Sequence, residues 1–412
     1  MAGLVESLNS RFNAAHNNIP DGSLGRCAKD FAAGIVLPYI GKTHPLTQET
    51  VMTYDNTPDG NLAPLPGQRS IALAGGLLTL ALGCLGPTNA AAAGAYCSDT
   101  AAALNRACGF DLQDNYWVAV AVCTNETDAA DRKKCLAEAS TARSESQDLC
   151  KEQMAGRLDA CAVLGEGRYD PPFEPRFFDK DFTRLTRPNR YFPLGIGNHW
   201  EYWTGTRGVQ SEANIVEILS DTKLIDEVTC LVARDLVYEA DGALKEATDD
   251  WFAQAKNGDV WYCGEEVKNY EFFEGDQPQA PELVGVDGRF KADIEGAKPG
   301  FIFKANPVVG ETYLEEFSLA NAEDTAQVFS KTYHYGEDAE LDRFVPQKLA
   351  QLLCHHDCVV TENVSLLEPG IVERKYYAPG IGTFLETNPD SGEITRLVKC
   401  NVNALCASLP AP

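Results

Sequence analysis

Basic residues are scarce in this sequence. Its 412 residues include 35 Lys and Arg but 60 Asp and Glu, which gives a formal net charge of −25. A protein that binds nucleic acid needs a basic surface to meet the phosphates, and an anionic membrane surface attracts basic residues for the same reason. The composition therefore argues against both kinds of partner. An acidic exterior of this kind usually favours solubility.

Signatures of common enzyme classes are absent as well. The sequence has no G-x-S-x-G and no H-E-x-x-H motif, and the glycine pairs at 195–197 and 380–382 lack the third glycine of a phosphate-binding loop. Acidic pairs such as Asp249 and Asp250 are common in so acidic a chain and do not by themselves indicate catalysis. We expect a protein without enzymatic activity. A secreted hydrolase that uses two carboxylates is the alternative.

The sequence has no apolar run long enough to span a membrane comfortably. The run from Ile71 to Leu85 has about 15 residues, whereas a transmembrane helix needs about 20. Because Arg69 precedes this run and small residues follow it, residues 70–95 are typical of an export signal cleaved after Ala95. A lipid anchor at Cys84 is the alternative. The signal would begin about 70 residues into the chain, so either the start codon is misassigned or the protein carries a long N-terminal extension. We favour misassignment and expect residues 1–69 to have no native fold.

The chain contains 14 cysteines but no C-x-x-C pair of the kind that holds zinc. This usage favours disulfides formed in an oxidising compartment. In one cluster, Cys354, His356 and Cys358 would share a face of a strand and could bind zinc or copper. The alternative is a loop that a disulfide closes and that carries two surface histidines. No other cofactor is expected.

Six cysteines between 97 and 161 are spaced as a palindrome. The sums 97+161, 108+150 and 123+135 all equal 258, so every pair is centred on Ala129. An antiparallel helical hairpin with its tip near Ala129 gives this spacing, and a turn of about 100° per residue puts the three cysteines of each arm on one stripe. The spacing predicts three nested disulfides: Cys97–Cys161, Cys108–Cys150 and Cys123–Cys135. The pairing of Cys230, Cys263, Cys354, Cys358, Cys400 and Cys406 stays open.

A change from helical to alternating periodicity divides the rest of the chain. We expect the hairpin at 96–168, a Pro-rich linker at 169–190, a β domain at 191–400 and a tail at 401–412. About ten short strands without intervening helices predict a curved antiparallel sheet or open barrel, so the fold class is α+β. Asn257-Gly258 predicts a two-residue type I′ hairpin turn. Residues 345–353 are the exception and predict a short helix.

From Tyr191 onward the sequence resembles an uncharacterised family of exported bacterial proteins. The shared segments read YFPL..GN.W.Y at 191–202, DW.AQ...G.VWY.GE at 250–265, GAKPG at 296–300, NP.VG..Y..E at 306–315 and LEPG..E.KYYAPG.G at 367–382. They cover about half of the chain. The resemblance implies a secreted all-β domain and carries no activity over. Relatives have a short hairpin where this chain has Phe344 to Cys358, so that insertion is where a property peculiar to this protein is expected.

Aromatic residues recur on the predicted strands and could line one concave face, where they would bind an apolar or sugar ligand. The alternative is that they only fill the core. The candidate ligand-binding residues are Trp200, Trp203, Trp251, Trp261, Tyr262, Glu373 and Tyr376. We expect an exported protein, periplasmic or at the cell surface, that binds a ligand, a lipid or a partner chain through this face.

Overall fold

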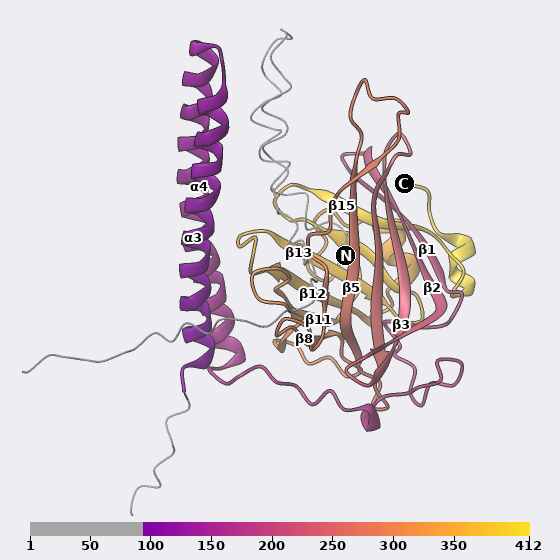
Figure 1. The fold of residues 1–412 in the computed structure, drawn as a ribbon. Coiled ribbons are helices and arrows are strands. Elements are labelled where there is room, and N and C mark those ends of the chain that lie inside the picture. The colour runs from indigo at the N-terminus through magenta and orange to yellow at the C-terminus, as the bar shows by residue number, and fades with distance from the viewer. Residues whose placement is uncertain (1–93) are drawn as a thin grey trace, which may run out of the picture. The chain divides into compact units, whose positions relative to one another are not determined.

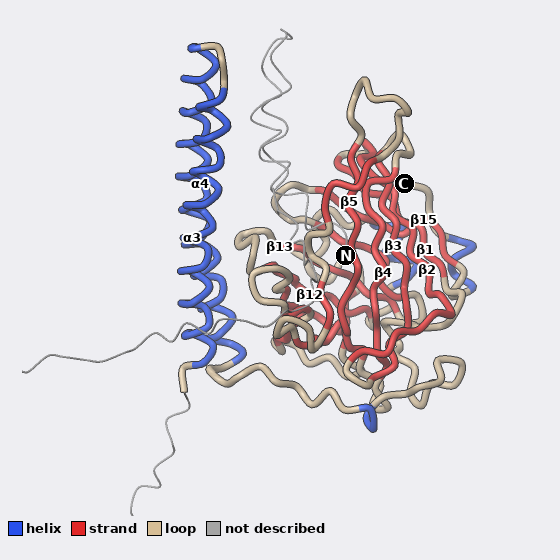
Figure 2. Tube along the Cα trace, viewed as in Figure 1, coloured by secondary structure: helices blue, strands red, loops and turns tan. Residues whose placement is uncertain are grey.

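A computed structural model describes residues 94–412, in which a pair of long helices precedes a large antiparallel sheet (Figure 1). Helical structure is concentrated in the first pair, and strands make up most of the rest (Figure 2). Among residues 94–412 no helix is long and apolar enough to cross a membrane. The predictions for segment 1–69, for Cys84 and for nearly all of the export signal lie outside the described residues.

The hairpin consists of α3 (Tyr96–Asn125) and α4 (Ala129–Leu164). A short turn joins them, in which the Asp128 side chain caps α4 by accepting hydrogen bonds from the backbone N–H groups of Ala130 and Asp131 at 2.7 and 3.0 Å. The predicted nested pairing is confirmed, with Cα–Cα distances of 5.6, 5.9 and 5.5 Å from the outermost disulfide to the innermost.

Few apolar side chains of the hairpin are buried. The buried ones are Ala101 and Cys123 in α3 and Ala139, Cys150 and Cys161 in α4. Apart from two alanines, this interior therefore consists of cysteines. The disulfides supply the stability that a hydrophobic core would otherwise provide.

The second part of the chain forms one 15-stranded antiparallel sheet, confirming the predicted class of fold. Helix α5 (Gln347–Leu353) is the short helix expected in the insertion. The strands are β1 (His199–Thr206), β2 (Val209–Ile225), β3 (Val228–Glu239), β4 (Leu244–Gln254), β5 (Val260–Glu271), β6 (Glu282–Gly285), β7 (Phe290–Lys291), β8 (Lys298–Phe303), β9 (Thr312–Leu314), β10 (Glu316–Phe317), β11 (Asp324–Tyr333), β12 (Cys358–Ser365), β13 (Val372–Ala378), β14 (Gly382–Thr387) and β15 (Glu393–Cys400).

The two edges of this sheet come together. The strand order runs β10-β8-β5-β4-β3-β2-β1-β15-β14-β13-β12-β11-β9. Strands β9 and β10 stand at opposite ends of that order, yet only Glu315 separates them in the chain. The sheet is therefore nearly closed and barrel-shaped, and it has an inner and an outer face.

The linker covers part of the outer face. Phe173 and Phe178 pack against Trp261 of β5, with ring centroids 5.7 and 5.6 Å away. The same cluster contains Trp251 and the disulfide between Cys230 and Cys263. The other two pairings that the sequence left open are Cys354–Cys358 and Cys400–Cys406.

The β4–β5 hairpin is present, but its turn differs from the prediction. The backbone N–H of Gly258 donates to the carbonyl of Ala255, and that of Ala255 donates to Asp259, both at 2.8 Å. Gly258 has φ +96°, whereas Asn257 is not among the residues with positive φ. The type I′ prediction is therefore wrong, because that turn needs positive φ at both central residues. The turn is longer, with glycine at its left-handed position.

A buried ion pair links the hairpin to the sheet. The guanidinium of Arg157 in α4 donates to both carboxylate oxygens of Glu323, just before β11, at 2.8 and 2.9 Å. Both side chains are buried, with 6% and 4% of their surface exposed. Gln153 of α4 also donates to the carbonyl of Leu367 at 2.8 Å. Polar contacts from α4 therefore connect the hairpin to the second part of the chain.

Candidate functional site

The inner face of the curved sheet encloses a cavity of about 150 Å³. Strands β1 to β4 form one part of its wall, and β13 to β15 form the other. Successive side chains on a strand point to opposite faces, so most of these strands contribute every second residue. In this way β1 presents Trp200, Tyr202 and Thr204, and β13 presents Glu373, Lys375 and Tyr377.

The register of the strands places apolar and acidic residues side by side on the cavity wall. Val216 stands opposite Trp200 on one side and Asp235 on the other, and Thr204 stands opposite Glu212. Phe192 and Phe252 add to the apolar part of the wall. A ligand in this space would meet apolar and charged surfaces together.

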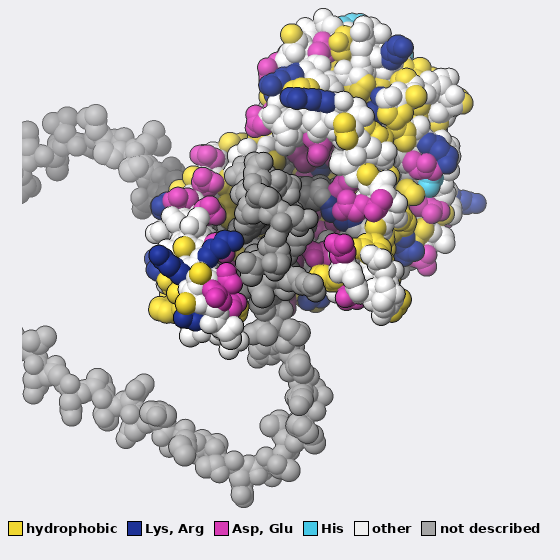
Figure 3. Space-filling view, turned by 90° about the horizontal axis from the view of Figure 1, so that it is seen from above, with side chains coloured by type: hydrophobic (Ala, Val, Ile, Leu, Met, Phe, Trp, Pro, Cys, Tyr) yellow, Lys and Arg dark blue, Asp and Glu magenta, His cyan; other side chains and the backbone are white. Residues whose placement is uncertain are grey.

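Carboxylates outnumber cations on the cavity wall. The acidic residues are Glu212, Asp235, Asp250, Glu373, Glu386 and Glu393, and Lys375 is the one basic residue that lines the cavity. On the face shown in Figure 3, Lys and Arg side chains lie among the Asp and Glu side chains. The cavity wall, in contrast, carries a clear excess of acidic over basic side chains.

Each of these acids lies within a hydrogen-bonded or charged network. The hydroxyl of Tyr262 donates to Asp250, and the amide of Asn214 donates to Asp235 at 2.8 Å. Lys375 and Glu386 are paired residues of adjacent strands. Burial by itself would lower the pKa of Lys375, but Glu315, Glu386 and other nearby groups raise that pKa well above its usual value, so the ammonium stays charged.

Burial raises the pKa values of four of the acids that line the cavity. The pKa of Asp250 rises to about 7, through burial first and then the nearby charge of Asp235. The pKa of Glu212 also rises to about 7, again through burial and then neighbouring carboxylates. Burial raises the pKa values of Asp235 and Glu373 too. These carboxyl groups consequently hold protons at a pH where exposed ones do not.

The structure brings two of the seven ligand-binding candidates to the cavity wall, Trp200 and Glu373. Tyr262 reaches the site through its bond to Asp250. The other four, Trp203, Trp251, Trp261 and Tyr376, are not among the residues that line the cavity. Trp251 and Trp261 lie in the outer cluster beneath the linker. Tyr376 is buried and donates its hydroxyl to the carbonyl of Leu341 at 2.7 Å.

Adjacent residues on a strand explain this outcome. Asp250 precedes Trp251, and Tyr377 follows Tyr376. In each pair the prediction names the aromatic residue Trp251 or Tyr376, whereas its neighbour, Asp250 or Tyr377, lines the cavity. The pattern of alternation was readable in the sequence, but which of its two phases faced inward was not. Glu212, Asp235, Lys375 and Glu386 carried no motif that would have distinguished them from the other charged residues.

The predicted set of metal ligands Cys354, His356 and Cys358 is wrong. Cys354 and Cys358 form a disulfide, so neither offers the thiolate that a metal requires. The two cysteines are four residues apart, and the disulfide closes a small loop between α5 and β12. His356 lies within that loop. This is the alternative that the sequence left open.

Comparisons with known proteins give limited similarity. No family model matches the chain, and no curated protein matches it. Two solved structures match, a "putative lipoprotein" from Parabacteroides distasonis at 11% identity and a "putative exported protein" with a YmcC-like fold from Bacteroides fragilis at 12%. Each covers 52% of this chain and 99% of its own, with a TM-score of 0.27. At that score neither likeness supports a conclusion about fold or function.

Proposed function

We propose that this is an exported protein that binds a small cationic ligand with an apolar part in the cavity of its sheet. The observation that carries the proposal is the cavity wall, on which six carboxyl groups and one ammonium group lie among apolar side chains. Buried carboxylates are costly when they are unpaired, so the site favours either protons or a cation. Lys375 lies on the wall and Lys245 pairs with Glu212, and a cationic ligand would add positive charge beside the remaining carboxyl groups.

The size of the cavity limits the ligand. An apolar cavity of about 150 Å³ can hold a molecule the size of benzene, and the cavity here has about that volume. The fit favours a small amine with a short alkyl or aromatic group over a whole lipid.

Export is supported by the disulfides. All 12 cysteines in residues 94–412 are paired, and disulfides persist in oxidising compartments. The resemblance of residues 191–382 to a family of exported bacterial proteins is a second reason. We infer that the mature protein begins near Tyr96, and sequencing the N-terminus of protein recovered from the exporting cell tests this.

A secreted hydrolase is the second candidate, and the convergence of several acids in one cavity favours it. Acid–base catalysis by two carboxyls, however, requires environments that separate their pKa values. Burial raises the pKa values of Glu212, Asp235, Asp250 and Glu373 alike. These four shifts have the same direction and do not divide the four acids into a proton donor and an ionised partner, so we favour binding.

Three isosteric probes test the proposal: benzylammonium, benzyl alcohol and benzoate. They share an aromatic ring and differ in the charge of one substituent. Hydrogen bonds to charged groups contribute about 1.5–3 kcal/mol, so benzylammonium should bind at least about tenfold more tightly than benzyl alcohol. Benzoate should not bind. Fluorescence of Trp200, which lines the cavity, offers one readout, and calorimetry offers another.

Two neighbouring aspartates provide a matched pair of variants. Asp250→Asn removes a cavity carboxylate and should weaken benzylammonium binding at least about tenfold. Asp249→Asn changes the preceding residue, which pairs with Arg234 at 2.9 Å on the outer face. This variant should leave benzylammonium binding unchanged. Equal affinity for benzylammonium and benzyl alcohol would contradict the proposal. Turnover of a neutral ester or glycoside that Asp250→Asn abolishes would favour the hydrolase.

A further inference from the structure

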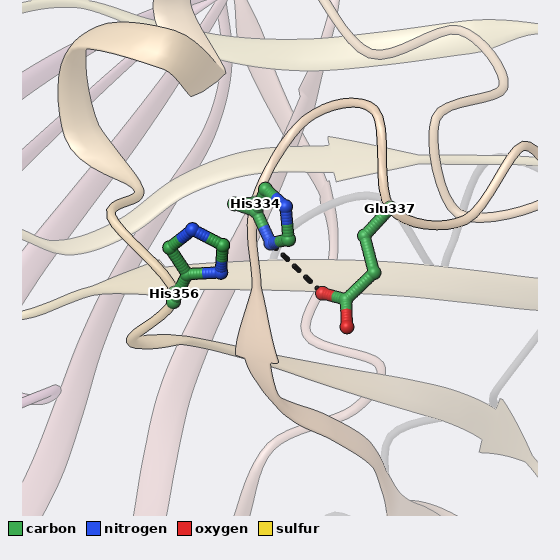
Figure 4. Close-up of side chains that lie close together, drawn as sticks. All are labelled: His334, Glu337 and His356. Atoms are coloured by element: carbon green, nitrogen blue, oxygen red, sulfur yellow. Dashed lines mark ion pairs between the residues drawn. The ribbon is translucent and has the colours of Figure 1, made fainter.

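Three metal-binding side chains meet outside the cavity. His334 follows β11, Glu337 lies three residues later, and His356 comes from the disulfide-closed loop before β12 (Figure 4). One potential ligand atom from each lies within 4.8 Å of the others. Nδ1 of His334 is 2.9 Å from a carboxylate oxygen of Glu337, and the two imidazole rings have centroids 3.6 Å apart. None of the three lines the cavity.

The loop that carries His356 is held in place by several contacts. His356 has φ +64°, a left-handed conformation that a residue with a Cβ seldom adopts without support. The Cys354–Cys358 disulfide closes the loop around it. Asp357 binds the guanidinium of Arg190 at 2.8 Å, and its carbonyl accepts a hydrogen bond from Tyr191 at 2.9 Å. Unfavourable backbone conformations that the surroundings maintain are often found at binding sites.

The other two side chains sit on an equally ordered turn. Asp342 accepts hydrogen bonds from the hydroxyl of Tyr333 and from the backbone N–H of Gly336, both at 2.9 Å. These contacts hold the residues on either side of His334 and just before Glu337. In the sheet, Tyr333 is paired with Cys358, which brings the turn and the loop together. Both halves of the cluster are thus preorganised by the fold.

From this arrangement we propose that His334, Glu337 and His356 bind a divalent transition-metal ion of the zinc class. Two neutral imidazoles and a carboxylate suit such ions, whereas Mg²⁺ and Ca²⁺ prefer sites made of oxygen ligands. Zinc holds these ligands at about 2.0–2.2 Å, so ligand atoms around one ion lie about 3–4 Å apart. Glu337 and His356 are exposed, and rotation of their side chains can close the remaining distance.

The site gives the insertion at Phe344 to Cys358 a role in metal binding, in which its two cysteines are not ligands. The disulfide does not contribute ligands but fixes the loop that presents His356 to His334. With three protein ligands, the ion would keep an open coordination position for water or another molecule. The proposal does not depend on the ligand-binding cavity, because the two sites share no residue.

Zinc binding to the metal-depleted full chain tests the proposal. We expect one Zn²⁺ per chain by calorimetry with a chelator as competitor, in the presence of excess Mg²⁺ to occupy surface carboxylates. His334→Gln and His356→Gln should each weaken binding at least about tenfold, since even the loss of a group that only supports a ligand costs about 10–100-fold. Circular dichroism without metal checks that each variant is folded.

Two other histidines serve as controls. His355 is the exposed neighbour of His356 and is not part of the cluster, and His199 pairs with Glu201 at 3.1 Å without a third metal ligand. His355→Gln and His199→Gln should leave zinc affinity unchanged. The proposal is overturned if the wild-type chain binds no zinc, or if His356→Gln binds as well as the wild type. Equal losses in all four variants would mean that zinc binds to histidines in general and not to this cluster, and unchanged affinity in all four would mean that it binds only to the acidic surface; either result overturns the proposal.

Discussion

The helical hairpin and the curved sheet differ most in what they bury. The interior of the hairpin consists of cysteines and two alanines, and large apolar residues such as Phe110 and Trp117 are 77% and 62% exposed. The sheet buries continuous clusters of aromatic and aliphatic side chains, among them Phe384 and Tyr377. Stability in the first region is therefore covalent, whereas in the second it comes from packing. The two regions should respond to different perturbations.

The largest expected effect is in the sheet. Phe384 is fully buried, so Phe384→Ala should lower the free energy of unfolding by about 3–5 kcal/mol. Phe110→Ala in α3 removes an equally large side chain that is mostly exposed, and should change stability by less than about 0.5 kcal/mol. Chemical denaturation of both variants measures the contrast. Similar losses would mean that the hairpin relies on apolar packing after all.

The next effect belongs to the hairpin. Cys123 and Cys135 are 12 residues apart, and a disulfide that closes a loop of this size contributes about 3 kcal/mol in the chain-entropy model. The double variant Cys123→Ser/Cys135→Ser should therefore open the tip of α3 and α4. Hydrogen exchange followed by mass spectrometry should show faster exchange there and unchanged exchange in β1 to β5. Faster exchange throughout the sheet would contradict the division.

A smaller effect is expected at the β4–β5 turn. Gly258 has φ +96°, and an added Cβ would lie 2.9 Å from Cβ of Ala305. Gly258→Val should cost about 1–3 kcal/mol for the left-handed conformation, and the contact with Ala305 should add to this loss. Thermal melting measures the loss, and Gly242→Val serves as a control with a similar φ of +92° but no neighbour within 4 Å of the added Cβ. Equal losses in both would show that conformation, not contact, sets the cost.

The hairpin and the sheet also differ in how far the sequence predicts their structure. The palindrome of cysteines defined the hairpin and its pairing, because helical geometry converts spacing directly into facing positions. Alternation located most strands, but it has two phases that the sequence does not distinguish. The prediction therefore names Trp251 as a ligand-binding residue, whereas its neighbour Asp250 lines the cavity. The junction of Arg157 with Glu323 and the meeting of His334 with His356 depend on tertiary folding, and neither has a local signal.

Binding of a cation in the cavity should depend on pH. Because burial raises the pKa values of Asp250 and Glu212 to about 7, these groups hold protons below that pH and lose them above it. A bound cation and these protons compete for the same carboxylates, so cation binding must strengthen as the pH rises through about 7. A primary amine stays largely protonated over this range.

The most direct test is the affinity for benzylammonium at about pH 5.5 and about pH 8, in the wild type and in Asp250→Asn. We expect the wild type to bind at least about tenfold more tightly at the higher pH, since each buried carboxylate that ionises adds a charged partner. Asp250→Asn should bind more weakly and depend less on pH. Binding of the wild type that does not change between the two pH values would contradict the account of an acidic cavity that takes up a cation.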